Sequence, residues 1–194
     1  MMKAGITGGI GSGKSVVSEL FRMRGIPVYA ADREAKQLND HSPLIREQLT
    51  ARFGKELYAD GNLNRSLLAT LMFQDKQRVA AVNAIVHPIL AQSFLEWCSR
   101  HRGDKLVMID AALLFEAGFA SYLDRVITVY APVEIRLERV IKRDHTCREA
   151  VQERMKHQMP EEEKMRQSDF VIHNDGSQSL IRQSAAILEQ LLQL

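Results

Sequence analysis

The sequence predicts an α/β protein in which a five-stranded parallel sheet is flanked by helices, and three observations lead to this prediction. The first is a glycine-rich turn, residues 8–15, that joins a short apolar run to a helix-like run. The second is the alternation of short apolar runs with amphipathic runs, which favours a parallel sheet covered on both faces. The third is the length of 194 residues with 45% hydrophobic and 26% charged residues, which is typical of one globular domain.

The glycine-rich turn reads Gly-Gly-Ile-Gly-Ser-Gly-Lys-Ser and matches the pattern G-x-x-x-x-G-K-S. It follows a strand predicted over 2–7 and precedes a helix predicted over 16–24, which is the order that a phosphate-binding loop needs. In this pattern Lys14 reaches the β- and γ-phosphates and the hydroxyl of Ser15 ligates Mg²⁺. The turn therefore predicts a nucleoside triphosphate site. The alternative is a glycine-rich turn before an ordinary helix.

The first helix is expected to end at Gly25, and a second strand is expected over 27–31. Asp32 follows that strand directly and precedes a strongly helix-forming run. A carboxylate at the end of a strand in an α/β sheet lies where ligands bind, but Asp32 can equally be the N-cap of the next helix. The two roles do not exclude each other.

Residues 39–104 are predicted to form a helical insertion between two strands, because their apolar residues do not alternate with period two. We expect a loop over 39–43, a turn over 60–62, and helices in the amphipathic runs 44–53, 65–73 and 79–97. Pro88 disfavours the α conformation for His87, so the third helix is expected to break or kink there. The insertion is either a substrate-binding lobe or structural padding.

Three further strands are predicted over 105–110, 125–131 and 169–173, and a final helix over 179–194 covers the sheet. The third of the five predicted strands ends in Asp110. A carboxylate in that position is suited to hold Mg²⁺, directly or through water.

The segment 134–167 lies between the last two predicted strands and is rich in charge. Arg139 and Arg143 are four residues apart and so lie on one helix face, from which both can point at the same phosphate group. A positive helical segment that accompanies a phosphate-binding loop is typical of a lid that excludes water and neutralises a transferring phosphoryl group. A solvated helix face is the alternative.

Charge and composition argue against several classes of function. The net charge of +2 is too small to indicate nucleic acid or an acidic membrane as a partner. Cys98 and Cys147 lie far apart and form no metal-binding or redox motif. The sequence shows neither a signal-peptide pattern nor a run of about 18 apolar residues. We therefore expect a cytoplasmic protein. For the oligomeric state we expect a monomer or a weak homo-oligomer.

Several separate segments together resemble the dephospho-coenzyme A kinase family, and the resemblance runs from Ile6 to about Gly176. The matching motifs are Ile6–Ser15, Asp32-x-x-Ala35, Asp60-Gly61-x-Leu63-x-Arg65, Asn83-x-Ile85-x-His87-Pro88, Asp110-x-x-Leu113-Leu114-Phe115-Glu116, Arg139-x-x-x-Arg143, Arg154-x-x-x-Gln158 and Asp169-Phe170-Val171-Ile172-x-Asn174-x-Gly176. The phosphate-binding loop alone is shared with many kinases, but the ordered set is much more specific.

The resemblance implies ATP-dependent phosphorylation of the 3′-hydroxyl of the dephospho-coenzyme A ribose, with ATP and dephospho-coenzyme A as partners and Mg²⁺ bound with ATP. It also implies a P-loop NTPase core, so we expect 1–194 to form a single P-loop kinase domain. Its parts are a core at about 1–38, 105–133 and 168–194, a helical coenzyme A lobe at about 39–104, and a lid at about 134–167.

The residue roles implied by the resemblance follow its motifs. The expected catalytic residues are Asp32, Lys14, Arg139 and Arg143, with Asp32 accepting the proton of the ribose hydroxyl or orienting that hydroxyl. The expected ATP site comprises Gly11, Ser12, Gly13, Lys14, Ser15, Val16, Asn174 and Gly176. The expected acceptor site comprises Asp32, Arg65, His87 and Glu116, and the expected Mg²⁺ ligands are Ser15 and Asp110. The alternatives are a core histidine for His87, a surface residue for Arg65 and a helix cap for Glu116.

The sequence departs from the family pattern at Ala30, where a second aspartate is usual, at Ala112, where proline is usual, and at Arg136, where glutamine is frequent. Another P-loop kinase, acting on a nucleoside, a nucleotide or shikimate, is the nearest alternative, and the motifs around Arg65 and His87 argue against it. A nucleotide-binding switch such as a GTPase is a further alternative. It should carry Asn-Lys-x-Asp and an Asp-x-x-Gly after the third strand, and the sequence has neither.

Overall fold

The computed structural model describes residues 1–59, 61–72 and 75–193, and the chain divides into two compact units. The α/β unit consists of Met1–Ala30 and Cys98–Leu194, and the helical unit consists of Ala31–Trp97. The helical unit thus begins before residue 39, the predicted start of the inserted lobe. Some predicted positions lie outside the described residues. They are Asp60 of the predicted turn and the last residues of the helices predicted over 65–73 and 179–194.

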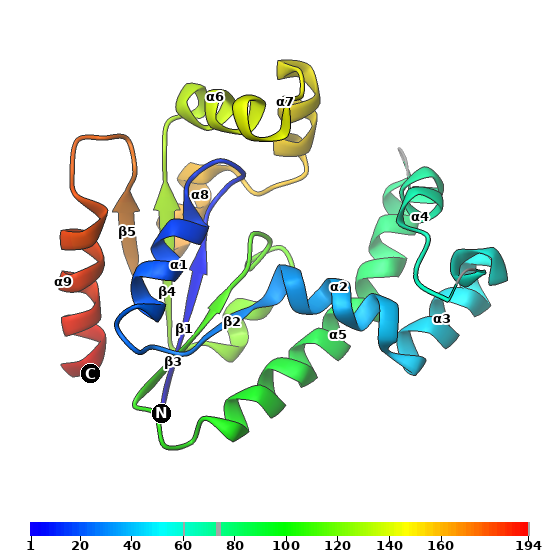
Figure 1. Cartoon of the computed structure of the whole chain (residues 1–194), viewed down its shortest axis with the longest axis horizontal. Coiled ribbons are helices and arrows are strands. Elements are labelled where there is room, and N and C mark those ends of the chain that lie inside the picture. The colour runs from blue at the N-terminus through cyan, green and yellow to red at the C-terminus, as the bar shows by residue number, and fades with distance from the viewer. Residues whose placement is uncertain (60, 73–74, 194) are drawn as a thin grey trace. The chain divides into compact units, whose positions relative to one another are not determined.

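The α/β unit contains a sheet whose strands are all parallel, as predicted. The strands are β1 (Met2–Thr7), β2 (Val28–Ala30), β3 (Leu106–Asp110), β4 (Arg125–Tyr130) and β5 (Phe170–His173). Their order across the sheet is β2-β3-β1-β4-β5 (Figure 1), so β1 is the central strand. Ile6 of β1 is in register with Asp110 of β3, which brings the carboxyl ends of these two strands to the same edge of the sheet.

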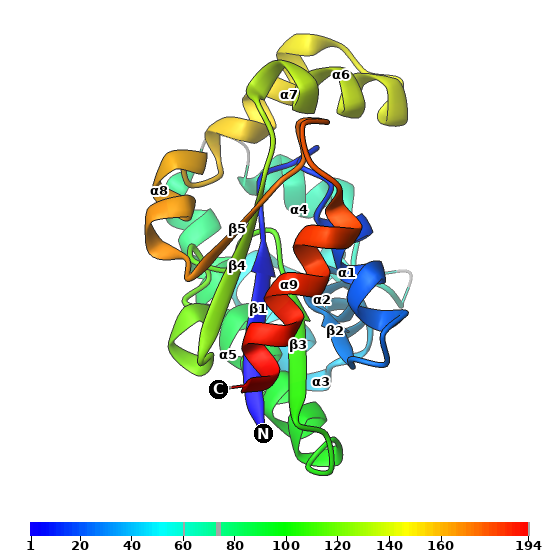
Figure 2. The same cartoon turned by 90° about the vertical axis from the view of Figure 1, so that its left-hand side faces the viewer.

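One face of the sheet is covered by α1 (Lys14–Arg22) and α9 (Leu180–Gln193), which also contact each other (Figure 2). Alternate residues of the strands point to this face, as the period of two in a β-strand requires. The core that they form with the two helices includes Ala4, Ile6, Met108, Ile127, Val129, Val17, Phe21, Ile187 and Leu188. The burial of this apolar surface fixes the position of α1, and with it the end of the glycine-rich turn.

The opposite face is covered by the chain that follows β3 and by α8 (Glu161–Gln167). Gly5 of β1 points to this face, and the side chains of Leu114 and Leu123 leave no room there for a Cβ atom. On β4, Thr128 contacts the Lys164 carbonyl and the Ser168 hydroxyl from the α8 side, at 3.4 and 2.6 Å. The sheet is therefore covered on both faces, as the sequence predicts.

The end of α1 differs in detail from the prediction. The α-helix ends at Arg22, two residues earlier than expected, and a tighter turn continues to Gly25. Gly25 has φ +79°, and the N–H groups of Gly25 and Ile26 donate to the carbonyl groups of Arg22 and Phe21, at 2.9 and 3.2 Å. This pair of bonds with a left-handed glycine is the Schellman motif, so Gly25 does end the helical segment.

The helical unit confirms that the insertion is helical but corrects one of its expected boundaries. Its elements are α2 (Ala31–His41), α3 (Pro43–Phe53), the 3₁₀ helix η1 (Lys55–Tyr58), α4 (Arg65–Met72) and α5 (Lys76–Arg100), of which the end of α5 passes into the α/β unit. The predicted loop over 39–43 shrinks to Ser42, because α2 continues to His41. Leu38 of α2 packs against the apolar cluster of this unit, and this packing holds the last turn of α2 in place despite its polar sequence.

Of the break or kink predicted at His87, the break is wrong, because α5 is continuous through Pro88, and the kink stays a prediction. A proline inside a helix removes one backbone hydrogen bond, which packing can offset. Val82 and Val86 before the proline are buried in the apolar cluster of the helical unit, and Ile89 after it packs against the same cluster. The part of α5 before Pro88 and the part after it therefore pack against the same apolar cluster.

By length and composition alone, α5 is also long and apolar enough to cross a membrane. The helix contains an 18-residue window of high mean hydropathy, but it is not an unbroken apolar run, because Asn83, His87 and Gln92 interrupt it. One such helix is weak grounds for a membrane span. Val82 and Val86 of α5 are buried in the apolar cluster of the helical unit.

The segment predicted as a lid contains α6 (Val133–Asp144) and α7 (Arg148–Lys156), followed by a connector to α8. In Figure 1, α6 and α7 stand beyond the carboxyl ends of β1 and β4. Leu137, Val140 and Val151 form the apolar cluster that holds the two helices together, and Ile10 of the glycine-rich turn packs against it. The lid segment therefore rests on the turn through an apolar contact.

Candidate functional site

The glycine-rich turn connects β1 to the first residue of α1, Lys14, at the carboxyl edge of the sheet. Gly13 precedes the helix with φ +93°, and the side chain of Asn174 occupies the space that a Cβ atom would need. Gly11 has φ +82°, and a Cβ atom there would lie 2.5 Å from the carbonyl oxygen of Arg136. Residues other than glycine rarely adopt such φ values, so the turn depends on glycine at both positions.

Lys14 contacts Asp110, the last residue of β3. Both side chains are largely buried, with exposed fractions of 12% and 10%. The other carboxylate oxygen of Asp110 accepts a hydrogen bond of 2.7 Å from the hydroxyl of Ser18. The structure thus brings together the lysine predicted to bind phosphates and the carboxylate predicted to hold Mg²⁺.

Asn174 and Arg139 lie against the same turn from two further elements. The side-chain amide of Asn174, just after β5, donates to the carbonyl of Ser12 at 2.7 Å. Arg139 of α6 donates to the carbonyl of Asn174 at 3.0 Å and to that of Gly11 at 3.4 Å. The guanidinium of Arg139 is therefore placed beside the predicted phosphate cradle in a fixed orientation.

Arg143 has a different environment from Arg139, although both belong to α6. Its guanidinium pairs with Asp144 through hydrogen bonds of 2.7 and 3.1 Å, and Asp144 also pairs with Arg154 at 2.8 Å. Hydrogen bonds from these two arginines hold the pKa of the Asp144 carboxyl well below its usual range. The expectation that both arginines of α6 point at one group is therefore not met in this structure, because the neighbouring Asp144 binds Arg143 on an exposed surface.

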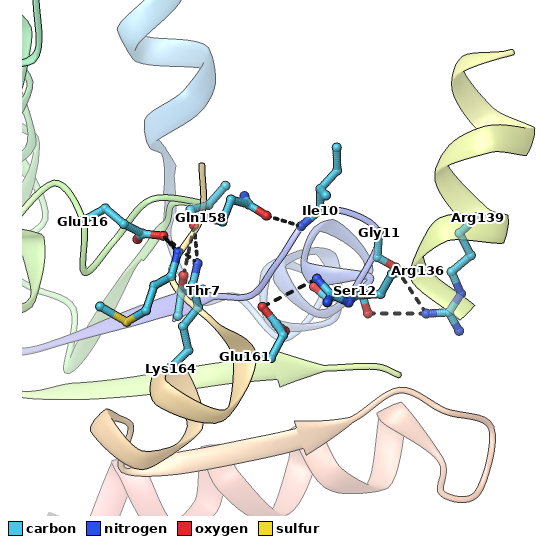
Figure 3. A network of polar contacts seen from close by, with 12 residues as sticks. Thr7, Ile10, Gly11, Ser12, Glu116, Arg136, Arg139, Gln158, Glu161 and Lys164 are labelled. Atoms are coloured by element: carbon cyan, nitrogen blue, oxygen red, sulfur yellow. Dashed lines mark hydrogen bonds and ion pairs between the residues drawn. The ribbon is translucent and has the colours of Figure 1, made fainter. Parts of the chain in front are cut away.

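The connector between α7 and α8 contacts the beginning of the turn, and motif reasoning did not predict this contact. The amide oxygen of Gln158 accepts a hydrogen bond of 2.9 Å from the backbone N–H of Ile10 (Figure 3). Glu161, the first residue of α8, lies against Gly9, where a Cβ atom would be 2.4 Å from its Oε1 atom. Arg136 of α6 faces Glu161, with 3.7 Å between Nη1 and Oε1. Burial raises the pKa of the Glu161 carboxyl, and the nearby Arg136 charge opposes that rise.

Glu116 is bound within the α/β unit. Its Oε1 atom accepts a hydrogen bond of 2.7 Å from the backbone N–H of Met159 and pairs with Nζ of Lys164 at 3.1 Å. The Lys164 side chain is completely buried and also donates to the carbonyl of Ala112 at 3.0 Å. Glu116 thus joins the chain after β3 to the lid connector, and its predicted part in binding the acceptor stays a prediction.

Three of the predicted acceptor residues belong to the helical unit. Asp32 lies in the first turn of α2, which begins at Ala31, so the N-cap alternative is wrong. Arg65, the first residue of α4, pairs with Asp40 at 2.7 Å and donates to the Lys36 carbonyl at 3.3 Å. The hydrogen bond from Arg65 lowers the pKa of the Asp40 carboxyl.

His87 also belongs to the helical unit and is half-buried on α5. Burial lowers the pKa of its imidazole below the ordinary value. The neutral form is therefore favoured near neutral pH, in which one ring nitrogen donates a hydrogen bond and the other accepts one. Such a group fits an uncharged polar ligand and a core histidine equally well.

The donor set for Mg²⁺ consists of the Ser15 hydroxyl, in the exposed first turn of α1, and the Asp110 carboxylate. Both supply oxygen, the ligand atom that Mg²⁺ prefers. Within the described residues no group of three or more His, Cys, Asp or Glu side chains is placed to hold a metal. The residues present fit an ion that keeps waters and takes further ligands from phosphate oxygens.

Comparisons with known proteins agree on one family. The family model described as dephospho-CoA kinase matches residues 2–179. A relative from Bacteroides fragilis named dephospho-CoA kinase is 42% identical over 192 residues, which cover 99% of this chain and 94% of that protein. A crystal structure of a Thermus thermophilus protein has a TM-score of 0.84 and 37% identity, with 98% and 97% of the two chains covered. The structure of dephospho-CoA kinase from Campylobacter jejuni has a TM-score of 0.71 and 25% identity, with the same coverage.

Proposed function

The chain belongs to the dephospho-CoA kinase family, and we propose that it transfers the γ-phosphoryl group of ATP to the 3′-hydroxyl of the ribose of dephospho-CoA. The products are CoA and ADP, and the reaction is the last step of CoA synthesis. The observation that carries the proposal is the convergence of Lys14, Asp110 and Arg139 on one glycine-rich turn. This set combines a phosphate-binding turn with two cationic side chains and a carboxylate, the groups that phosphoryl transfer uses.

The ATP phosphates are bound by the turn and the start of α1. In this proposal the backbone N–H groups of residues 11–16 hold the phosphates, and Lys14 leaves Asp110 to contact the β- and γ-phosphates. Arg139 is already oriented by the carbonyl groups of Asn174 and Gly11. Asn174 and Gly176 form the turn after β5, which we assign to the adenine side of ATP.

Charge on the transferring group is stabilised by arginines from the lid. Arg139 stands beside the cradle, and Arg143 joins it when phosphate competes successfully with Asp144 for the guanidinium. The new bond forms between the ribose oxygen and the γ-phosphorus as the bond from that phosphorus to the β–γ bridging oxygen breaks. Little covalent help from the protein is needed, because the transition state is loose and positioning dominates.

The acceptor is assigned to Asp32, Arg65, His87 and Glu116. Asp32 accepts the proton of the ribose hydroxyl or orients that hydroxyl in line with the γ-phosphorus. Arg65 supplies a cation for the anionic groups of dephospho-CoA, and His87 supplies a neutral donor and acceptor. Ser15, and Asp110 directly or through water, would hold Mg²⁺, which would supply positive charge beside the phosphates.

We further propose a cytoplasmic enzyme with a P-loop kinase core, a CoA-binding helical lobe and a lid over about 134–167. A monomer or a weak homo-oligomer satisfies this proposal, and no nucleic acid or membrane partner is needed for it. The helical unit, Ala31–Trp97, is the part of the chain that we assign to the lobe, together with the end of α5.

ADP release with ATP and Mg²⁺ tests the function when dephospho-CoA, adenosine, AMP, shikimate and no acceptor are compared. We expect turnover with dephospho-CoA alone, and a product with the mass of CoA. Turnover with another acceptor would keep the kinase core and discard the assignment of Arg65 and His87. ADP release that ignores the acceptor would point instead to an ATPase or a nucleotide switch.

A further inference from the structure

The backbone N–H of Ile10 is held by a side chain from the far end of the lid. Its partner is the amide oxygen of Gln158, which is 148 residues away in the sequence and stands at the end of α7, in the connector to α8. Ile10 is the third residue of the glycine-rich turn, directly before the residues assigned to the phosphates. Figure 3 shows Gln158 reaching Ile10 from the opposite side of the turn to Arg139.

The turn needs such support because its backbone is intrinsically soft. Four of the six residues from 8 to 13 are glycines, and glycine loses more conformational freedom on ordering than any other residue. If the cradle becomes ordered only when phosphate binds, the conformational entropy lost on ordering weakens the binding. A cradle that is already ordered binds more tightly, without any additional contact to the ligand.

Two contacts from the lid order Ile10, which stands between Gly9 and Gly11. The Ile10 side chain packs against the apolar cluster of Leu137, Val140 and Val151, while its N–H is bound by Gln158. Glu161 at the start of α8 lies against Gly9, where a Cβ atom would be 2.4 Å from its Oε1 atom, so side chains from both ends of the connector contact two consecutive residues of the turn. Gln158 contributes a hydrogen bond to the backbone with no charge of its own, so it can order the turn without repelling phosphate.

We infer that Gln158 is a positioning residue for the phosphate cradle, which holds Ile10 and thereby pre-orders residues 11–16 for the triphosphate. It does not touch the reacting atoms in this role. The inference requires that a nucleotide binds at the turn, and it does not depend on the identity of the acceptor. A test that measures nucleotide binding without an acceptor therefore separates its failure from the failure of the proposed reaction.

The variant Gln158→Met tests the inference, because methionine has a similar length but cannot accept this hydrogen bond. We expect the Kd for ADP, measured by calorimetry without acceptor, to rise roughly tenfold, as loss of a hydrogen bond to a half-buried N–H predicts. The KM for ATP should rise by a similar factor, and the KM for dephospho-CoA should stay within twofold. Gln158→His places an uncharged acceptor, a nitrogen of the neutral imidazole, at a similar reach and should recover part of the ADP affinity when measured at about pH 8.

Gln167→Met is the matched control, since Gln167 is exposed on α8 and its amide donates to Glu163 at 3.2 Å, away from the turn. It should leave the Kd for ADP unchanged. An unchanged Kd in Gln158→Met, or an equal loss in Gln158→Met and Gln158→His, would overturn the inference. Circular dichroism checks that each variant is folded. If Gln158→Met does not fold, Gln158→Asn shortens the reach to Ile10 and should raise the Kd in the same way.

Discussion

Lys14 and Asp110 contact each other at the ends of two neighbouring strands, one at the start of α1 after β1 and the other at the end of β3. Ser18, one turn further along α1, donates to the same carboxylate at 2.7 Å. The pair keeps the lysine charge compensated in a nearly buried site before any phosphate arrives. In the proposed reaction, nucleotide binding would replace Asp110 with phosphate as the anionic partner of Lys14 and would free the carboxylate for Mg²⁺.

Lys14→Met should abolish most phosphoryl transfer and also destabilise the fold. We expect kcat to fall roughly 10²–10³-fold, as removal of a charge that stabilises the transition state does in other enzymes. The free energy of unfolding should fall by about 3 kcal/mol, because Asp110 keeps a nearly buried charge without its cation. Steady-state kinetics and urea denaturation measure the two effects.

The double variant Lys14→Met with Asp110→Asn separates the two effects. Asparagine can still accept the hydrogen bond from Ser18 but carries no charge, so part of the lost stability should return. Activity should stay low, since both charged groups are then missing. A double variant as unstable as Lys14→Met alone would show that the ion pair is not what stabilises this edge of the sheet.

Arg139→Lys should reduce kcat roughly 10²-fold or more, even though the positive charge is kept. The planar guanidinium bonds at once to the carbonyl groups of Asn174 and Gly11, and an ammonium group cannot reproduce this geometry. Arg143→Lys should cost less, because the Arg143 side chain is 60% exposed and bound to Asp144. Phosphoryl transfer rates at saturating ATP compare the two variants.

Arg148→Lys is the control for this comparison, because Arg148 is an exposed lid arginine that pairs with Glu134. Its kcat should match that of the unmodified enzyme. If all three lysine variants lost the same factor, the general charge of the lid would matter and the fixed position of Arg139 would not.

The sheet and the phosphate site could be predicted from the sequence because their signals are local. Each strand is a short apolar run, and the spacing of Gly8, Gly13 and Lys14 determines both the backbone shape and the chemistry of the turn. The end of the first helical segment is also a local signal, because it depends on the left-handed φ of +79° at Gly25.

The contacts of the lid connector could not be predicted in the same way. Gln158 and Ile10 are separated by 148 residues, and no periodicity links them. The buried Lys164 stands in a run of charged residues that reads as a solvated helix, and only the fold brings it to Glu116. Pro88 shows the reverse case, in which a correct local rule is overridden by apolar packing on both sides of the proline.

Asp32→Asn should lower kcat by roughly 10²–10⁴-fold while ADP binding stays within twofold. Asparagine has nearly the same shape but cannot accept a proton from the ribose hydroxyl. Ala30 stands where the family usually carries a second aspartate, so no other carboxylate of that strand end can replace Asp32. Normal turnover in Asp32→Asn, measured by ADP release with dephospho-CoA, would remove Asp32 from the mechanism.

His87 should make the stability of the protein depend on pH on the acid side of neutrality. Burial lowers its pKa, so the unfolded chain binds a proton more readily than the folded chain does. The stability contributed by the neutral imidazole is therefore present above the ordinary histidine pKa of about 6.5 and is lost as the pH falls through the lower pKa of the folded state. One proton limits this slope to about 1.4 kcal/mol per pH unit.

His87→Gln should flatten that loss, as followed by urea denaturation between about pH 7 and pH 5. His157→Gln is the control, because the His157 side chain is 78% exposed and its substitution should leave the slope unchanged. The same His87 variant distinguishes the two roles of this residue. A histidine that binds the acceptor raises the KM for dephospho-CoA when replaced, whereas a core histidine changes only the dependence of stability on pH.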